Sequence, residues 1–360
     1  MNLTIKKIRI KELEEFTNSK AFYNLRFIPI SPLRARSYLG NPHSNPDDVV
    51  LYLGFIADRL VAFRTLFADV LNSRNEQIRF GWCSGAWVHP DFRRKGFSKQ
   101  LLNEAYNDWD KKLMFTNYTP LSEKLIQETG WFKSIHQFKG VRAYLFPKTK
   151  KLIAKANSNL FFKFVFTIID FFILICSNIR LCFYSGQNYS SVQFETLEFP
   201  DKECYQLTGK DKTEYNRGEK ELKWIFNNPW ISSDKKDDQS NYPFSSFSNS
   251  FYYRTVKLFS KNKLEGFIVF SVREGHLKTL YTNLPDEYFA EITTYLKSFC
   301  KQNKIEVLTI YKKALAAELF KRNFPFLHVK KYGQKIYSTF EFNCNKVYLF
   351  QDGDGDVFFT

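Results

Sequence analysis

The stretch Trp87-Val-His-Pro-Asp-Phe-Arg-Arg-Lys-Gly-Phe-Ser98 decides the fold of the first half of the chain. A predicted strand ends at Val88, Pro90 stops it, and a loop with three cations and one glycine runs directly into a predicted helix. The first amides of that helix have no intrahelical acceptor, the helix dipole adds partial positive charge, and Gly96 lets an anion approach the backbone. The residues therefore predict a phosphate-binding strand, loop and helix. The alternative is a solvated cationic turn.

Apolar patterns on either side of this loop give the first half the predicted order β-α-β-β-β-α-β-α-β. From Tyr252 to Phe340 the second half repeats the outline without repeating the sequence. It lacks the loop, because Thr282-Asn-Leu-Pro-Asp-Glu287 holds two acids and neither a glycine nor a cation at the corresponding place. We therefore expect a mixed α/β chain built from two copies of one architecture, of which only the first has the anion site.

The spacing Arg93-x-x-Gly96-x-Ser98 resembles the Q/R-x-x-G-x-G/A loop of the GNAT superfamily of acyl-CoA-dependent N-acetyltransferases. The stretch from Asn117 through Ser122 to Gly130-Trp131 resembles the second motif of that family. The resemblance implies a central mixed, mostly antiparallel sheet flanked by helices, in two tandem GNAT-like domains. It also implies acetyl-CoA as cosubstrate, with cofactor-binding residues Val88, Arg93, Arg94, Lys95, Gly96, Phe97, Ser98 and Asn117.

In this family the amine attacks the thioester directly, and a backbone N–H near the end of the strand before the loop, here around Val88, polarises the carbonyl. Ile126 stands where a tyrosine often protonates the leaving thiolate, and the strand from Phe80 to Val88 offers no carboxylate base. The nearest catalytic candidates are Tyr118 and Glu128. Packing is the alternative role for Tyr118, and a solvated helix face is the alternative for Glu128.

The domain division expected from these patterns is contiguous. Residues 1–148 form the catalytic domain, 149–190 an amphipathic linker helix, 191–345 a degenerate GNAT-like domain, and 346–360 a C-terminal β-hairpin. Within the last segment Asp352-Gly-Asp-Gly-Asp356 imitates the start of a calcium loop, but Val357 occupies the glycine position of such a loop. A tight hairpin turn is the favoured interpretation, and we assign no metal.

The linker contains a nearly continuous apolar run, Leu160 to Cys176, which is shorter than the roughly 20 residues a spanning helix needs and includes Lys163 and Asp170. Such a helix packs between domains or lies in a membrane surface. Lysines on its N-terminal side suit anionic lipid, so peripheral membrane contact through 148–182 stays open. The six scattered cysteines indicate neither a disulfide framework nor a zinc site. This favours a location in the reducing cytoplasm. If the helix touches lipid, the protein would lie at the inner face of the membrane.

The formal net charge of +16 attracts nucleic acid, anionic lipid or a phosphate-bearing cosubstrate. The resemblance selects the third, and no nucleic acid is expected. The leading hypothesis is an acyltransferase, not transferring aminoacyl groups, that moves an acetyl group from acetyl-CoA to an unidentified amine. Alternatives are an aminoacyl transferase resembling the FemAB group and a non-catalytic membrane-surface protein. We expect the loop Ser31 to Asp48 to overhang the acceptor, with Arg34 and Arg36 meeting an anionic group and Asp47 and Asp48 an amine.

Overall fold

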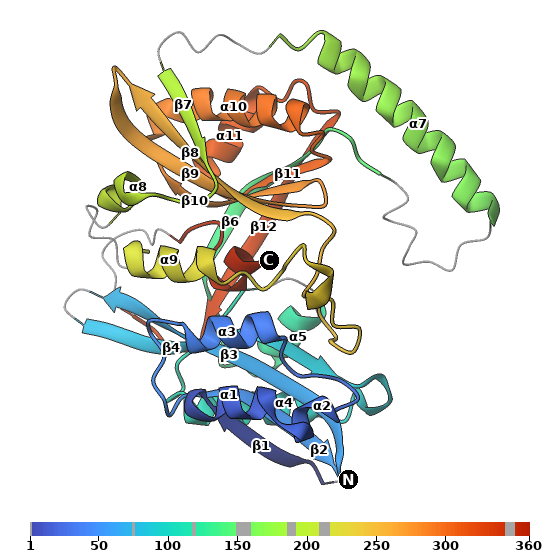
Figure 1. Cartoon of the computed structure of the whole chain (residues 1–360), viewed down its shortest axis with the longest axis vertical. Helices are drawn as coiled ribbons and strands as arrows, with labels where there is room; N and C mark the ends of the chain where they lie inside the picture. Colours follow the sequence, from blue (N-terminus) through green and yellow to red (C-terminus); the bar gives the residue numbers. More distant parts are fainter. Residues whose placement is uncertain are drawn as a thin grey trace. The chain divides into compact units, whose positions relative to one another are not determined.

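The computed structural model describes residues 2–73, 76–116, 120–148, 160–185, 192–208, 217–342 and 350–360 (Figure 1). The chain forms two compact units, and each is discontinuous in sequence. Unit 1 consists of Met1–Gln137, Tyr205–Asn249 and Gln334–Thr360, and unit 2 consists of Phe138–Cys204 and Ser250–Gly333. The structure thus divides the chain differently from the contiguous division at residue 148.

Unit 1 contains one sheet whose strands follow the order β1-β2-β3-β4-β5-β12, and all neighbours are antiparallel except the parallel pair β4 and β5. Its strands are β1 (Thr4–Arg9), β2 (Val49–Ile56), β3 (Arg59–Ser73), β4 (Glu76–Val88), β5 (Leu113–Thr116) and the end of β12 (His328–Ser338). Its helices are α1 (Ile10–Asn18), α2 (Lys20–Tyr23), α3 (Pro32–Leu39), η1 (Pro90–Phe92), α4 (Phe97–Asp108), α5 (Pro120–Glu128), α9 (Glu219–Asn227), η2 (Lys235–Asp237) and η4 (Gly355–Phe359).

Unit 2 repeats this order as β7-β8-β9-β10-β11-β6, again with a single parallel pair, β10 and β11. Its strands are β7 (Val192–Leu197), β8 (Phe251–Ser260), β9 (Lys263–Arg273), β10 (His276–Asn283), β11 (Val307–Ile310) and the end of β6 (Lys133–Tyr144). Its helices are α7 (Leu160–Cys182), η3 (Asp286–Tyr288), α10 (Phe289–Gln302) and α11 (Lys313–Lys321), and α8 (Lys202–Leu207) begins in it. The expected repeat of one mixed, mostly antiparallel architecture is confirmed.

The two units exchange their sixth strands. Residues Ile336 to Ser338 of β12 pair with β5 in unit 1, whereas Val141 to Tyr144 of β6 pair with β11 in unit 2. Each sheet is therefore completed by a strand from the other half of the sequence. Hydrophobic periodicity reports which face of a strand is buried and says nothing about which distant strand it will join.

The two faces of the unit 1 sheet are covered differently. One face packs on α4 through apolar side chains such as Leu101, Leu102 and Ala105. The other face carries an aromatic layer in which Trp230 and Phe359 stack with ring centroids 4.5 Å apart and Phe67 contacts both rings. Part of the 18% aromatic content thus lies in one layer between the sheet and the segments around α3, α9 and η4.

The C-terminal residues belong to this layer, and the expected hairpin is wrong for the part that is described. Gly355–Phe359 form the 3-10 helix η4, and the side chains of Phe358 and Phe359 are 0% and 1% exposed. Gly355 has φ +86°, and a Cβ there would lie 2.6 Å from Trp82 Nε1. Burial of the Phe358 and Phe359 rings, together with the close approach of Gly355 to Trp82, favours this 3-10 helix over the hairpin that the Asp-Gly sequence indicates locally. Residues 346–349, which would form most of the first hairpin strand, lie outside the described residues.

Candidate functional site

Strands β4 and β5 separate after a short paired region. They pair only from Gly81 to Cys83 and from Leu113 to Phe115, although β4 continues to Val88. A bulge between Thr65 and Leu66 of β3 leaves Ser84 without a direct cross-strand partner. Within the described residues, the β5-facing edge of β4 beyond Cys83 therefore has no strand beside it.

The amides along this open edge can be assigned from the pairing with β3. His89 donates its amide to the Val61 carbonyl at 2.8 Å. Because amides alternate in direction along an antiparallel strand, those of Val88 and Ala86 point away from β3 toward the β5 side. The predicted backbone donor around Val88 is thus directed toward the open edge.

The loop after β4 has the geometry that the sequence predicts. Gly96 is the N-cap of α4 with φ +79°, and nothing lies within 4 Å of the position a Cβ would take. Its carbonyl accepts hydrogen bonds from the amides of Lys99 and Gln100, so the amides of Phe97 and Ser98 precede the first intrahelical bond. An anion can approach these donors without obstruction from a side chain at position 96.

The three predicted cations surround this helix start and are exposed. Arg93 donates from Nε to the Val88 carbonyl at 3.4 Å, Arg94 has φ +62°, and the Lys95 ammonium lies 4.8 Å from the centre of the Phe92 ring. Phe97, by contrast, is 3% exposed and packs in the core, so only its backbone amide is available to a ligand.

A buried cation that the sequence analysis did not predict lies behind the start of α4. Arg64 of β3 is 3% exposed, and its Nη2 lies 3.5 Å from the hydroxyl of Ser98. Its Nε has no hydrogen-bond partner within the part of the chain that the structure describes, and burial lowers the pKa of the guanidinium. A buried arginine with an unsatisfied donor is costly unless an acceptor is supplied.

On the opposite face, a hydrogen-bonded chain leads to the bulge in β4. The Tyr38 hydroxyl lies 2.5 Å from Ser84 Oγ, which lies 3.1 Å from Thr65 Oγ1. Arg34, 5% exposed, contacts Thr65 Oγ1 at 3.4 Å and covers the Trp230 ring at 4.0 Å. Burial raises the pKa of Tyr38 to about 12, so its hydroxyl stays protonated at neutral pH. Ser84 itself is half-buried, at the open edge.

The remaining predicted residues have less direct roles. Glu128 lies on an exposed face of α5, 3.8 Å from Lys124 in an i,i+4 ion pair, which supports the solvated alternative. Asn117 and Tyr118 lie outside the described residues. His89, at the end of β4, lies 2.7 Å from Arg59 and accepts a hydrogen bond from the Asp91 amide, so it holds the start of the loop in place.

The loop from Ser31 to Asp48 only partly meets its expectation. Arg34 lies beside the bulge of β4, as described above. The two acids are engaged elsewhere, because Asp47 forms an ion pair with Lys11 and Asp48 with Arg79. In the structure both acids have a cationic partner from this chain, and their contact with an amine stays a prediction.

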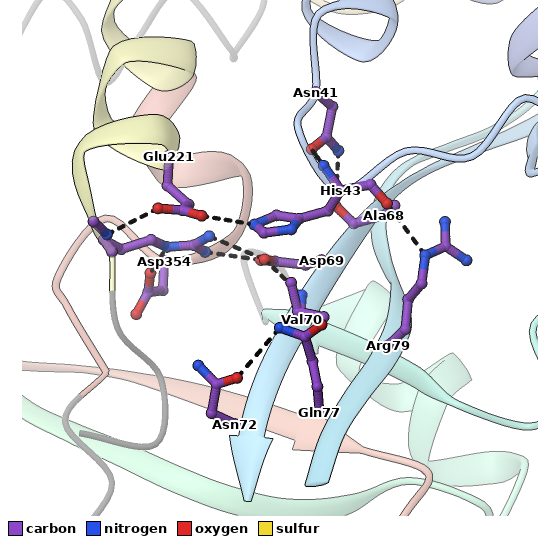
Figure 2. Close-up of polar contacts among 12 residues, drawn as sticks. Asn41, His43, Ala68, Asp69, Val70, Asn72, Gln77, Arg79, Glu221 and Asp354 are labelled. Carbon is purple, nitrogen blue, oxygen red and sulfur yellow. Dashed lines mark hydrogen bonds and ion pairs between the residues drawn. The ribbon is translucent and has the colours of Figure 1, made fainter. Parts of the chain in front are cut away.

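A second buried polar cluster lies in unit 1, and Figure 2 shows Asp69 and Asp354 converging beside Glu221 and His43. Arg217 holds Asp69 through two bonds of 2.8 and 3.0 Å and Asp354 through one of 3.0 Å. Burial raises the pKa of Asp354 to about 7. The cluster joins β3, the start of α9 and the C-terminal segment, so its role is structural.

Among the described residues of unit 2, the connection from β10 to α10 does not reproduce the anion loop of unit 1. Between β10 and α10 the chain passes through Pro285 and the short helix η3, whose first turn contains Asp286 and Glu287. Two acids before a helix would repel a phosphate. Among the described residues, no group of three or more His, Cys, Asp or Glu side chains is arranged to hold a metal ion.

No family model and no curated protein sequence matches this chain. Solved structures do match. A probable N-acyltransferase from Enterococcus faecalis V583 aligns over 94% of this chain and 72% of its own, with TM-score 0.51 and 9% identity. A GCN5-related N-acetyltransferase from Anabaena variabilis ATCC 29413 gives the same coverages, with TM-score 0.50 and 10% identity. The chain has the GNAT fold.

A third solved structure is matched over a larger share of its own length. Saccharomyces cerevisiae N-myristoyltransferase with bound myristoyl-CoA aligns over 93% of this chain and 82% of its own, with TM-score 0.51 and 12% identity. At these identities the likeness establishes the fold, and the chemistry has to be argued from the residues of the site.

Proposed function

We propose that unit 1 transfers an acyl group from acyl-CoA to an amine, with acetyl-CoA as the donor. The observation that carries this proposal is the separation of β4 from β5 immediately before the Gly96-capped start of α4. This arrangement combines an open strand edge, where an extended thioester arm can lie, with an anion site at its end. The acyltransferases among the matching solved structures support acyl transfer as the general class of reaction.

In this proposal the diphosphate of acyl-CoA accepts hydrogen bonds from the amides at the start of α4. Arg93, Arg94 and Lys95 add positive charge around it. Arg64 supplies a buried cation whose unsatisfied Nε favours a nearby anion. These groups orient the donor and do not take part in bond making.

The acyl carbonyl would lie along the open edge of β4, where the Val88 and Ala86 amides point. Such donors stabilise the negative charge that develops on the carbonyl oxygen when the amine attacks. Ser84 is the polar side chain at the bulge, and its bond to Tyr38 gives it a proton source. The C–N bond forms as the C–S bond breaks, and we assign to Ser84 the transfer of a proton to the leaving thiolate, in place of the tyrosine that Ile126 replaces. The nitrogen releases one proton to water, and Ser84 regains one from Tyr38 or water, so that the protons balance.

Calorimetry with acetyl-CoA tests the anion site. The double variant Arg93→Ala/Gly96→Val removes one cation and places a side chain in the open space above the α4 amides, so binding should fall below detection. Lys124→Ala, an exposed cation on α5, is the matched control and should bind as the unmodified chain does. Unchanged affinity in the double variant would refute the proposal. Co-purified tRNA in place of CoA would instead favour the FemAB-like alternative.

We further propose that the protein works in the cytoplasm. The cysteines among the described residues, namely Cys83, Cys176, Cys182, Cys204 and Cys300, are all free thiols, which suits a reducing compartment. Fractionation of cells that express a tagged chain tests this location. Recovery from an extracellular or periplasmic fraction would contradict it.

A further inference from the structure

Helix α7 of unit 2 is apolar and exposed. It is 23 residues long, and one window, Phe164–Cys182, has mean hydropathy 1.9 with only 11% of it buried. By length and composition it is the one helix among the described residues that could cross a membrane. The interpretation as a helix packed between domains does not fit this exposure. Its large exposed apolar side chains are Phe164, Ile168, Ile169, Phe171, Phe172, Leu174, Ile175 and Ile179.

The exposed side chains cover most of the helix circumference. At about 100° per residue the exposed apolar side chains extend from Leu174 through Phe164 to Ile169, an arc of about 220° that also includes the exposed polar residues Thr167 and Asn178. A helix that packs on one protein partner needs an apolar stripe of about 100° or more, so the exposed arc of α7 is about twice the width that such packing requires. The wider arc fits a surrounding apolar solvent, which is lipid.

The remaining strip attaches α7 to unit 2 at its C-terminal end. Ser177, at the centre of the strip and 0% exposed, donates to the Leu145 carbonyl at 2.5 Å. Arg180 donates to the carbonyls of Pro325 and Phe326 at 3.0 Å each, and Leu181 is part of the core. The C-terminal turn is therefore fixed, and the preceding part is presented outward.

The chain contacts unit 2 both before α7, at Lys148, and at the C-terminal end of α7, which argues against a membrane-spanning α7. Lys148 forms an ion pair of 2.7 Å with Glu306 of unit 2, and Ser177 and Arg180 hold the other end there. If α7 crossed a bilayer, residues 149–159 would have to cross back. That segment contains Lys150, Lys151 and Lys155, each costing about 2.5 to 3.5 kcal/mol at the centre of the hydrocarbon layer.

We propose that α7 lies in the plane of an anionic lipid bilayer, with its apolar arc in the acyl-chain boundary, and attaches unit 2 to that surface. The net charge of +16 strengthens the attraction of the chain to anionic headgroups. The proposal rests on unit 2 and does not depend on acyl transfer in unit 1.

Co-sedimentation with vesicles tests the attachment. The full chain should bind vesicles of equal parts phosphatidylglycerol and phosphatidylcholine at least about tenfold more tightly than phosphatidylcholine alone, and salt should weaken the binding. Phe164→Glu/Phe172→Glu, which leaves the C-terminal attachment of α7 untouched, should reduce binding by about tenfold or more. Phe320→Glu, at an exposed position of α11, is the matched control and should bind normally. Equal binding by the α7 variant would overturn the proposal.

Two further readouts separate lipid from the other occupants. Fluorophores attached one at a time at Phe164→Cys and Ile175→Cys, in a background with Cys176→Ser and Cys182→Ser, should be quenched by lipid-borne quenchers at the same shallow depth. A large difference in depth would indicate a span and refute the in-plane position. A dimer in solution that the Phe164→Glu/Phe172→Glu variant dissociates, together with no vesicle binding by the unmodified chain, would assign α7 to a second copy.

Discussion

Replacing Arg217 by Met should destabilise unit 1 strongly. The guanidinium is 4% exposed and its two partners, Asp69 and Asp354, are 1% and 0% exposed at the side chain. Three hydrogen bonds of 2.8 to 3.0 Å disappear, and two buried carboxyl groups lose the cation that they share. Removing one partner of a buried pair costs about 3 to 5 kcal/mol, and we expect a loss of this size.

The loss should grow with pH. Burial raises the folded-state pKa of Asp354 from 3.8 to about 7. A carboxyl whose pKa is raised on folding stabilises the fold fully below about pH 3.8, and this contribution is lost as the pH rises through 7. Arg217 lowers the pKa of Asp354 against this burial, so its loss should raise that pKa further and make the folded variant more dependent on a protonated Asp354. The difference in unfolding free energy should therefore be larger at pH 8 than at pH 5.

Tryptophan fluorescence in urea measures this difference in unit 1 alone. All six tryptophans lie in unit 1, at positions 82, 87, 109, 131, 224 and 230. Lys223→Met, which breaks an exposed i,i+4 pair with Glu219 on α9, is the matched control and should change stability by about 0.5 kcal/mol or less. A loss below about 1 kcal/mol for the Arg217 variant, or a loss that shrinks from pH 5 to pH 8, would refute the reasoning.

Two other predictions concern catalysis at Ser84 and the loss of folding stability at low pH. Ser84→Ala should lower kcat for acetyl transfer by about 100-fold with little change in KM, because it removes the proposed proton donor and no CoA contact; Glu128→Gln is the control, and equal rates in both variants would exclude Ser84. Glu221→Gln should flatten the loss of stability between pH 4.5 and 2. Although burial opposes it, the His43 hydrogen bond lowers the pKa of Glu221 to about 2, so its contribution is present above pH 4.5 and lost as pH falls. An unchanged acid transition, followed by tryptophan fluorescence, would contradict this second prediction.

The anion loop was predictable because its signals are local. The strand end at Val88, the break at Pro90 and the capping Gly96 act within a few residues of one another, and the structure reproduces each of them. Arg64 and Ser84 were missed because their positions depend on strand register. The bulge in β3 and β4 sets the direction of Ser84, and no sequence pattern along one strand reports a bulge in a pair.

The predicted domain division and the predicted C-terminal hairpin were wrong for the same physical reason. Pairing of β12 with β5 joins residues more than 200 positions apart, and only tertiary packing selects such a partner. Likewise, the Asp-Gly repeat at 352–355 is a strong turn signal, but burial of Phe358 and Phe359 against the aromatic layer decides the conformation.

The exchange of strands between the units constrains how the protein is made. Unit 1 needs residues from 334 onward, which leave the ribosome about 200 residues after Gln137. At roughly 5 to 20 residues per second, this interval lasts on the order of 10 to 40 seconds. During that time the open edge of β5 has neither its final partner nor the cover of η4, and an unpaired edge invites association with other chains. We therefore expect nascent chains to depend on chaperones until the last segment has emerged.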